Sequence, residues 1–231
     1  MRYFRTTILL FITTISLSTF VNAAALPDGP HVAVTGSAQI EVQPDQVNIQ
    51  FQATSLEKTA GSAKHNVDQQ VSALLTNLEK AGFDTNILER GKINSRAQYQ
   101  YIKDQRTLQG IVATRDLSYL LTDLEQVNQF LELVVAANIE SIGQMNYGLQ
   151  APQEWQLKAR QLAIQDSKEK AANLASAYQA KLGKIYAINY QHSYTQPLMM
   201  RAKSDQMAES SYQVNKIKVS DQVEAVFILE D

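Results

Sequence analysis

The clearest pattern in the chain is a strict alternation of apolar and polar positions over residues 47–54. Its apolar members are Val47, Ile49, Phe51 and Ala53. A period of two predicts a strand with one face on a core and one face in water. A second strand is predicted over residues 31–42, where Gly36 interrupts the alternation and indicates a bulge or a close backbone approach. We expect the two strands to form a hairpin that reverses at Pro44 and Asp45, because proline cannot donate to a ladder and aspartate caps turns.

Apolar residues at steps of three or four predict three helices. The first spans residues 59–81 and is followed by Gly82, which suits the left-handed residue after a helix. The second opens at Asp123, with Gln126 completing a capping-box pattern. The third and longest runs from residue 153 to about residue 182. Its predicted buried side consists of Trp155, Ala159, Leu162, Ala163, Leu174 and Tyr178.

The remaining patterned segments are predicted strands. Residues 83–101 and 106–121 should pair as a long hairpin, and further strands are expected near residues 139–149, 184–190 and 214–229. Because these strands group around three helices without strict alternation, we expect an α+β fold, with a mostly antiparallel sheet and the helices on one face. Residues 193–215 show no period and are interpreted as a mobile loop.

The first residues have the pattern of a targeting segment. Arg2 and Arg5 precede an apolar run that ends at Val21-Asn22-Ala23, with small residues at the expected cleavage positions. The run is shorter than the roughly 20 apolar residues of a membrane span, which favours a cleaved signal peptide over an anchor. The expected organisation is a signal peptide (1–23), a tail (24–30) and one domain (31–231) in the periplasm, with no transmembrane anchor.

Composition narrows the chemistry further. The chain has no cysteine, which excludes disulfides, thiol nucleophiles and thiolate metal sites. Its formal charge of −2, without a basic run, argues against nucleic acid as a partner. The three histidines lack ligand spacing, and no G-x-S-x-G motif occurs. No catalytic residue, cofactor or metal ligand is therefore assigned, and turn capping accounts for Asp45.

Two groups of side chains remain as candidates. Met199, Met200 and Met207 fall in the 193–215 loop, where thioethers could bind Cu(I) or be oxidised reversibly, although a mobile loop also tolerates methionine without a role. Tyr99, Tyr101 and Tyr119 could line a subunit interface, but tyrosine is equally acceptable at ordinary strand positions.

The edge of the 83–121 hairpin bears on the same question. An exposed strand edge with alternating tyrosine and glutamine can pair with a neighbour through its free backbone groups. We therefore expect a homo-oligomer to which this hairpin contributes.

Short segments spread along the chain carry a family resemblance. They are Val34-Thr35-Gly36, Val42-Gln43-Pro44-Asp45, Lys80-Ala81-Gly82, Gln98-Tyr99-Gln100-Tyr101, Gly110 and Leu182-Gly183-Lys184. In this order, over nearly all of residues 31–230, they resemble the SIMPL domain of the YggE-like periplasmic and secreted proteins, which include periplasmic immunogenic proteins. Ala97, where proline is common, and Ile111, where an aromatic often stands, depart from the pattern.

The resemblance implies an α+β fold, an envelope location and self-association, with a protective role against oxidative stress but no agreed activity or catalytic residues. Two function classes follow. The first is a non-catalytic envelope protein that works as an assembly or binding module. The second is an enzyme or metal-handling protein whose site is assembled by folding from distant residues.

Overall fold

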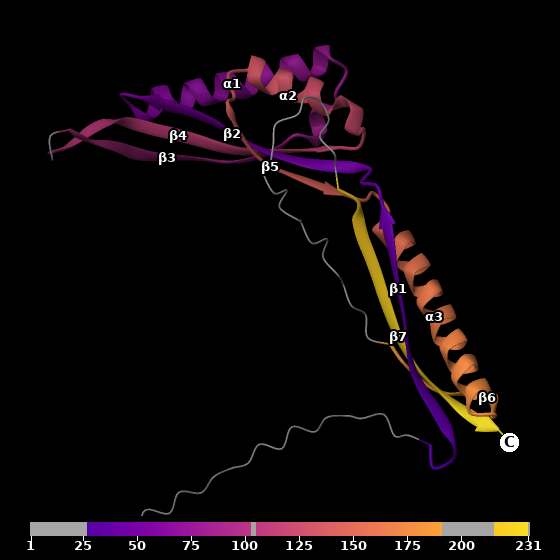
Figure 1. Ribbon diagram of the computed structural model, residues 1–231. Coiled ribbons are helices and arrows are strands. Elements are labelled where there is room, and N and C mark those ends of the chain that lie inside the picture. The colour runs from indigo at the N-terminus through magenta and orange to yellow at the C-terminus, as the bar shows by residue number, and fades with distance from the viewer. Residues whose placement is uncertain (1–26, 103–104, 191–214, 231) are drawn as a thin grey trace, which may run out of the picture.

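The protein is described here by a computed structural model that covers residues 27–102, 105–190 and 215–230. Two lobes, which we call the head and the arm, lie at an angle to each other (Figure 1). The head consists of β2 (Gln46–Glu57), α1 (Ala60–Lys80), β3 (Glu89–Ile102), β4 (Gln105–Leu121), α2 (Val127–Ala136) and β5 (Ser141–Gly148), with 3-10 turns η1 (Thr85–Ile87) and η2 (Leu124–Gln126). The arm consists of β1 (His31–Val42), α3 (Pro152–Ala177), β6 (Lys181–Asn189) and β7 (Ile217–Glu230).

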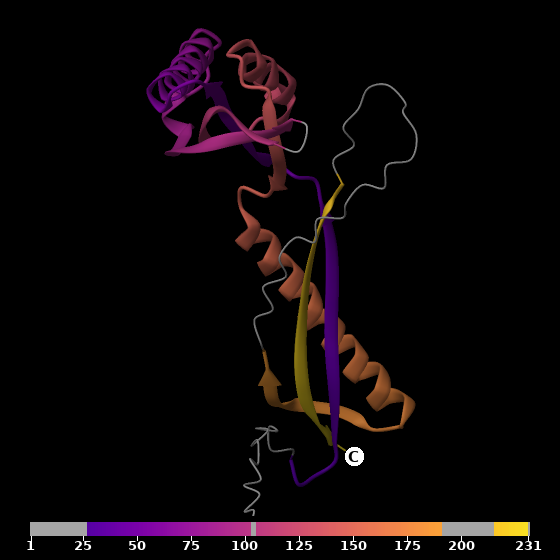
Figure 2. The same cartoon turned by 90° about the vertical axis from the view of Figure 1, so that its left-hand side faces the viewer.

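Each lobe has its own antiparallel sheet. In the head the strand order is β3-β4-β2-β5, and in the arm it is β1-β7-β6. The helices α1 and α2 cover one face of the head sheet, while α3 runs along the β1–β7 pair of the arm (Figures 1 and 2). The predicted α+β class, with three helices and mostly antiparallel strands, is confirmed. The strands form two sheets, however, instead of the single sheet that we expected.

The predicted hairpin of residues 31–55 is wrong, although both of its strands exist. β1 pairs with β7 over its whole length, from His31 opposite Ile228 to Val42 opposite Ile217. β2 lies between β4 and β5 in the other sheet. The prediction failed because alternation identifies the two faces of a strand but not its partner. Since β1 and β2 lie in different sheets, the residues around Pro44 connect the two lobes.

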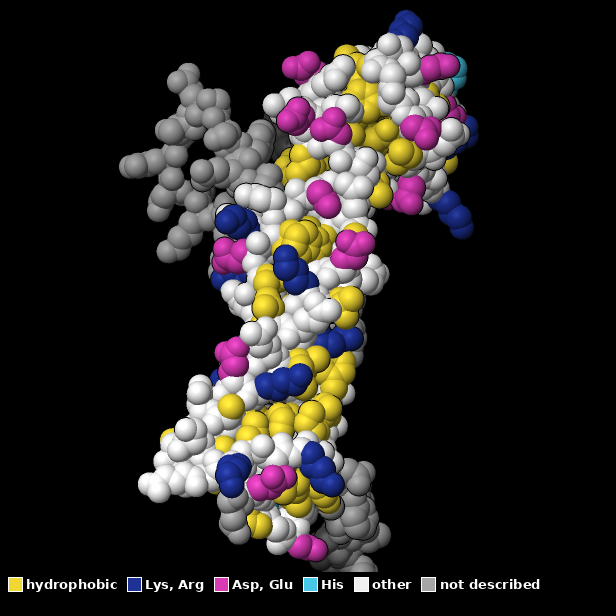
Figure 3. Space-filling view, turned by 90° about the vertical axis from the view of Figure 1, so that its right-hand side faces the viewer, with side chains coloured by type: hydrophobic (Ala, Val, Ile, Leu, Met, Phe, Trp, Pro, Cys, Tyr) yellow, Lys and Arg dark blue, Asp and Glu magenta, His cyan; other side chains and the backbone are white. Residues whose placement is uncertain are grey.

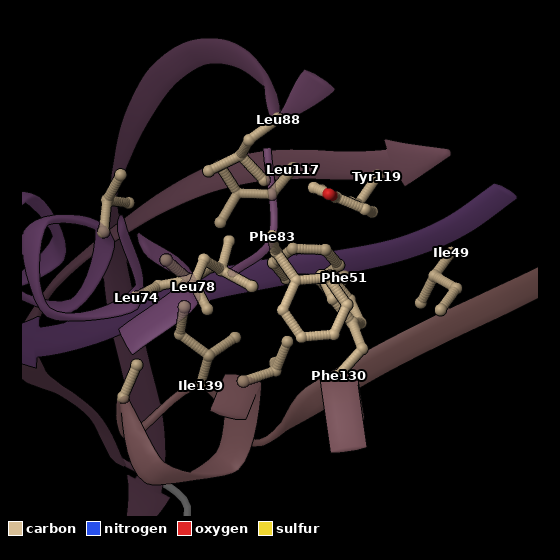
Figure 4. Packing of buried hydrophobic residues seen from close by; sticks show 14 of the residues in the cluster. Ile49, Phe51, Leu74, Leu78, Phe83, Leu88, Leu117, Tyr119, Phe130 and Ile139 are labelled. Atoms are coloured by element: carbon tan, nitrogen blue, oxygen red, sulfur yellow. The ribbon is translucent and has the colours of Figure 1, made fainter. Parts of the chain in front are cut away.

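The head core lies between α1, α2 and the inward face of its sheet. Ile49, Leu74 and Leu78 are fully buried there. Phe130 from α2 is the centre of an aromatic group, with ring centroids 5.9 Å from Phe51 and 5.8 Å from Phe83, both in edge-to-face geometry (Figure 4). Such pairs add about 0.5–1.5 kcal/mol each to the burial of apolar area. The alternation of β2 and the stripe of α1 therefore converge on one core.

The arm is held by a close approach of α3 to β1. A Cβ atom added to Gly36 would lie 2.0 Å from the Ala163 carbonyl oxygen and 2.6 Å from Ser167 Cβ, so only glycine fits between the strand and the helix. The interruption at Gly36 is thus the predicted close backbone approach. The buried side of α3 repeats every four residues: Ala159, Ala163, Ser167, Ala171 and Ala175.

Two details of α3 differ from the prediction. Leu162, Leu174 and Tyr178, expected on the buried side, are exposed by 42%, 42% and 81%, because the small residues permit close packing and the large ones face away. The helix also ends at Ala177, before Gln179 adopts a left-handed φ of 57°, and β6 begins at Lys181. In the head, Asp123 caps the turn η2 by accepting from the Glu125 backbone N–H, in place of the expected capping box at the start of α2.

Candidate functional site

The β3–β4 hairpin extends beyond the rest of the head. Pairing between β2 and β4 stops at Glu57 opposite Ile111, whereas β3 and β4 continue to pair as far as Ile102 opposite Gln105. We call this outer part, residues 97–102 and 105–110, the hairpin tip. It projects past the helices as a two-stranded ribbon (Figure 1).

One face of the hairpin tip carries large side chains in an exposed position. Tyr101 is exposed by 73%, Leu108 by 53% and Tyr99 by 43%. Tyr99 is the register partner of Leu108, and Tyr101 is the partner of Arg106, so the four share a face. The Arg106 guanidinium carbon lies 3.8 Å from the centroid of the Tyr99 ring. A cation–π contact therefore orders an aromatic surface that has no cover in the described chain.

Tyr119 lies elsewhere, in the head core. Its side chain is 2% exposed, and its ring packs 4.6 Å from the Phe130 centroid. The hydroxyl donates a hydrogen bond to the Asp84 carbonyl oxygen at 3.2 Å. Burial, with a smaller contribution from the Asp84 charge, raises the pKa of Tyr119. Of the three candidate tyrosines, only Tyr99 and Tyr101 are thus available to a partner, while Met199, Met200 and Met207 lie outside the described residues.

A polar hollow of about 510 Å³ lies on the face of the head sheet that the helices leave open. Polar residues from the two central strands form its floor, where Gln52 Nε2 donates to Asp116 Oδ1 at 2.7 Å. At its rim, Ser118 Oγ donates to Glu89 Oε2 at 2.8 Å. The folding thus brings two carboxylates to one surface. Within the described residues, no group of three or more His, Asp or Glu side chains is placed to hold a metal ion.

The bulges of the edge strands shape this hollow. β3 shifts register between Arg90 and Ile93, next to Gly91, and β5 shifts opposite the β2 segment from Ile49 to Phe51, at Gly143. Both glycines line the hollow and leave backbone in place of side chains. The alternation of glutamines in β2 did mark this polar face in the sequence, but nothing local indicated where the bulges would open it.

A buried carboxylate in the arm escaped the sequence analysis. The Asp221 side chain is 1% exposed and projects from β7 toward α3. It accepts hydrogen bonds from Gln156 Nε2 at 3.0 Å, Tyr190 Oη at 3.1 Å and the Gln222 backbone at 2.8 Å. Arg160 Nε donates at 3.3 Å, and its guanidinium carbon lies 4.5 Å from the centroid of the Tyr190 ring.

The charge of Asp221 is stabilised by these partners. Burial alone would raise the pKa of this carboxyl, but the hydrogen bonds from Gln156, the Gln222 backbone, Tyr190 and Arg160 together lower it below its ordinary value. The available signal was its position, because Asp221 occupies an inward site in the alternation Val219, Val223, Ala225. The network joins α3 to β7 and to Tyr190, the residue that follows β6. All four donors to the carboxylate come from this protein chain. We interpret the network as structural.

The fold and these surfaces define a class: an α+β protein of two lobes with an exposed aromatic ribbon. The chain belongs to the SIMPL family, described as a protein of unknown function (DUF541), whose model matches residues 32–227. Within the described residues, we find no helix with the length and apolarity of a membrane span.

Several relatives are similar along most of the chain. The uncharacterized protein YggE of Edwardsiella ictaluri is 31% identical over 90% of this chain and 91% of its own length. YggE of Escherichia coli K12 is 29% identical over 90% of this chain and 87% of its own length. The 26 kDa periplasmic immunogenic protein of Brucella melitensis biotype 1 is 26% identical over 78% of this chain and 75% of its own length.

Proposed function

We propose that this protein is a non-catalytic component of the periplasm that works as an assembly module, forming a homo-oligomer through the hairpin tip. The observation that carries the proposal is the hairpin tip itself, which displays Tyr99, Tyr101 and Leu108 beyond the cover of the head core. A link to protection against oxidative stress belongs to the proposal and rests on the family resemblance alone.

The energetics of a free ribbon favour an interface. An isolated two-stranded hairpin is only marginally stable in water, since it lacks a core to bury its side chains. β3 is also the outer strand of the head sheet, so one row of its backbone groups faces away from β4. Tyrosine and arginine are enriched where proteins associate. A second copy that packs on Tyr99 and Tyr101 would bury this surface and pair this edge at the same time.

Two observations support the periplasmic location. The relative from Brucella melitensis is named a periplasmic protein. The sequence has Arg2 and Arg5 near its start, and a short apolar run follows that ends at Val21-Asn22-Ala23, which is the pattern of a signal peptide. N-terminal sequencing of protein recovered from a periplasmic extract should give a chain that starts after Ala23.

The assembly proposal is tested with the double substitution Tyr99→Lys and Tyr101→Lys. Lysine disfavours edge pairing, and both side chains are exposed, so we expect the variant to fold normally but to lose assembly in light scattering. Tyr178→Lys is the matched control, because Tyr178 is an exposed tyrosine of the arm. A wild-type protein that remains monomeric at high concentration would refute the proposal.

One observation favours the alternative of an enzyme or a metal-handling protein. Glu89 and Asp116, from different strands, meet at the polar hollow. If this surface acts on a ligand or a metal ion, the double substitution Glu89→Gln and Asp116→Asn should abolish the binding of metal to the protein in a calorimetric titration. Assembly should remain intact. If the double variant gives the same heats of metal binding as the wild type, this alternative loses its support.

A further inference from the structure

A second surface, in the arm, has a different character. A groove of about 110 Å³ lies between α3 and β6, with Val223, Ala225 and Phe227 of β7 as its floor. It exists because β6 is the outer strand of the order β1-β7-β6 and α3 packs mainly on the other two strands. The lining is almost entirely apolar.

The walls of this groove are open to solvent. Ile188 is exposed by 61%, Ile185 by 45% and Ile164 by 37%. Ile185 is the register partner of Phe227, and Ile188 of Ala225, so both isoleucines point to the side of the sheet where α3 lies. Large exposed apolar side chains that line one depression mark an interaction site more often than a single exposed leucine does.

The charged residues that line the groove are both cations. Arg160 and Lys168 stand on the α3 wall, and the charge of Arg160 is matched by the buried carboxylate of Asp221. Of the nearby carboxylates of α3, Asp166 forms an ion pair with Lys170, whereas Glu169 accepts a hydrogen bond from the neutral Gln165 amide, keeps its charge and does not line the groove. Figure 3 shows apolar side chains along the arm with lysine and arginine, and some acidic, side chains between them.

We propose that this groove binds one aliphatic chain that carries an anionic head group, such as a free fatty acid. The chain would lie on Phe227 between Ile164 and Ile188, with the head group at the Lys168 ammonium. The volume is only a few times the roughly 30 Å³ of one water molecule, which suits a stretch of methylenes and not a folded partner. The cationic rim selects an anionic head group over a neutral or cationic one.

The test is a calorimetric titration of the purified full chain with alkanoates from propanoate to octanoate, below the concentrations at which they form micelles. We expect the Kd to fall about fourfold for each added methylene until the groove is filled, and then to level off. Octanol and octyltrimethylammonium should bind more weakly than octanoate. An unchanging Kd along the series, or no saturable binding, would overturn the proposal.

Variants locate the binding site. Ile188→Asp should weaken octanoate binding at least about tenfold, because a carboxylate would then stand in the apolar wall and repel the ligand. Leu162→Asp, an equally drastic change at an exposed α3 position outside the groove, should leave binding unchanged. Lys168→Gln should weaken octanoate binding about two- to fivefold without affecting octanol.

Other occupants give other results. If vesicles of anionic phospholipid bind while monomeric octanoate does not, the ligand is a membrane surface and the proposal fails. If Ile188→Asp instead lowers the mass in light scattering, the groove is an interface between copies of the chain and the proposal also fails. Should Ile188→Asp not fold, the chain-length series and the exposed Lys168→Gln variant still decide the question.

Discussion

The buried carboxylate of Asp221 shows how much of the arm depends on single side chains. Four donors converge on it from α3, β7 and the residue that follows β6. A charge removed from water is tolerated only when such partners replace its hydration. Asp221 therefore holds α3 on the arm sheet through polar contacts, whereas the rest of α3 is held there by the packing of its alanines.

The first prediction concerns pH. The folded-state pKa of Asp221 is lowered from its ordinary value of 3.8, so its contribution to stability is present above that value and is lost as the pH falls below it. Asp221→Asn should flatten the acid limb of the stability profile and cost about 2–3 kcal/mol near pH 7. Urea unfolding from pH 7 to pH 3 measures both effects. Parallel profiles for wild type and variant would contradict the assignment.

Residue roles were only partly predictable from the sequence. Gly36 indicated either a bulge or a close backbone approach, and the unbroken register of β1 with β7 leaves the close approach. Tyr119 in β4 and Tyr101 in β3 have the same strand pattern. The helices cover only one end of the β3–β4 hairpin, which makes Tyr119 a core residue and leaves Tyr101 on the surface. Three of the four donors to Asp221 lie 31 to 65 positions away in the chain, which no local pattern reveals.

At the scale of elements, the contact between α3 and β1 leads to the second prediction. Gly36→Ala should destabilise the protein by about 3 kcal/mol, because the added methyl group meets the Ala163 carbonyl oxygen, which belongs to rigid helix backbone. Gly61→Ala is the matched control. A Cβ atom there meets nothing within 4 Å, and alanine favours the helix by up to about 1 kcal/mol. Equal denaturation midpoints for the two variants would refute the close-packing account.

The predicted elements succeeded where the pattern is local and failed where partners matter. The α1 stripe and the β3–β4 hairpin follow from periods within the segment. The pairing of β1 with β7 joins residues from opposite ends of the chain, and alternation is the same whichever strand lies alongside. The prediction that Leu162 and Leu174 are buried was wrong for a related reason. Hydrophobicity alone does not reveal that a helix buries its small residues.

At the scale of the whole molecule, the head is an insertion into the arm. The chain leaves the arm after β1 and returns to it at α3, and the two crossings are tied together. The Asp45 backbone N–H donates to the Gly148 carbonyl oxygen at 3.1 Å, and Asp45 Oδ1 accepts from the Gln150 backbone N–H at 2.7 Å. Gln150 Nε2 also donates to the Asp45 carbonyl oxygen at 2.7 Å. Asp45 thus caps a junction between lobes instead of a hairpin turn.

This arrangement predicts that residues 43–150 fold without the arm. The principal core of the head draws all its buried members from Val47 to Ile139, so excision removes none of them. The ends of the fragment are already adjacent at Asp45 and Gly148, which means that cutting there leaves no gap for the chain to close. We expect a dispersed amide spectrum and a cooperative urea transition from the fragment. The arm requires β1 and β7 from opposite ends of the chain, so a fragment of residues 151–231 should stay unfolded. If residues 43–150 instead give a collapsed amide spectrum with no transition, the head depends on the arm and the two lobes form a single folding unit.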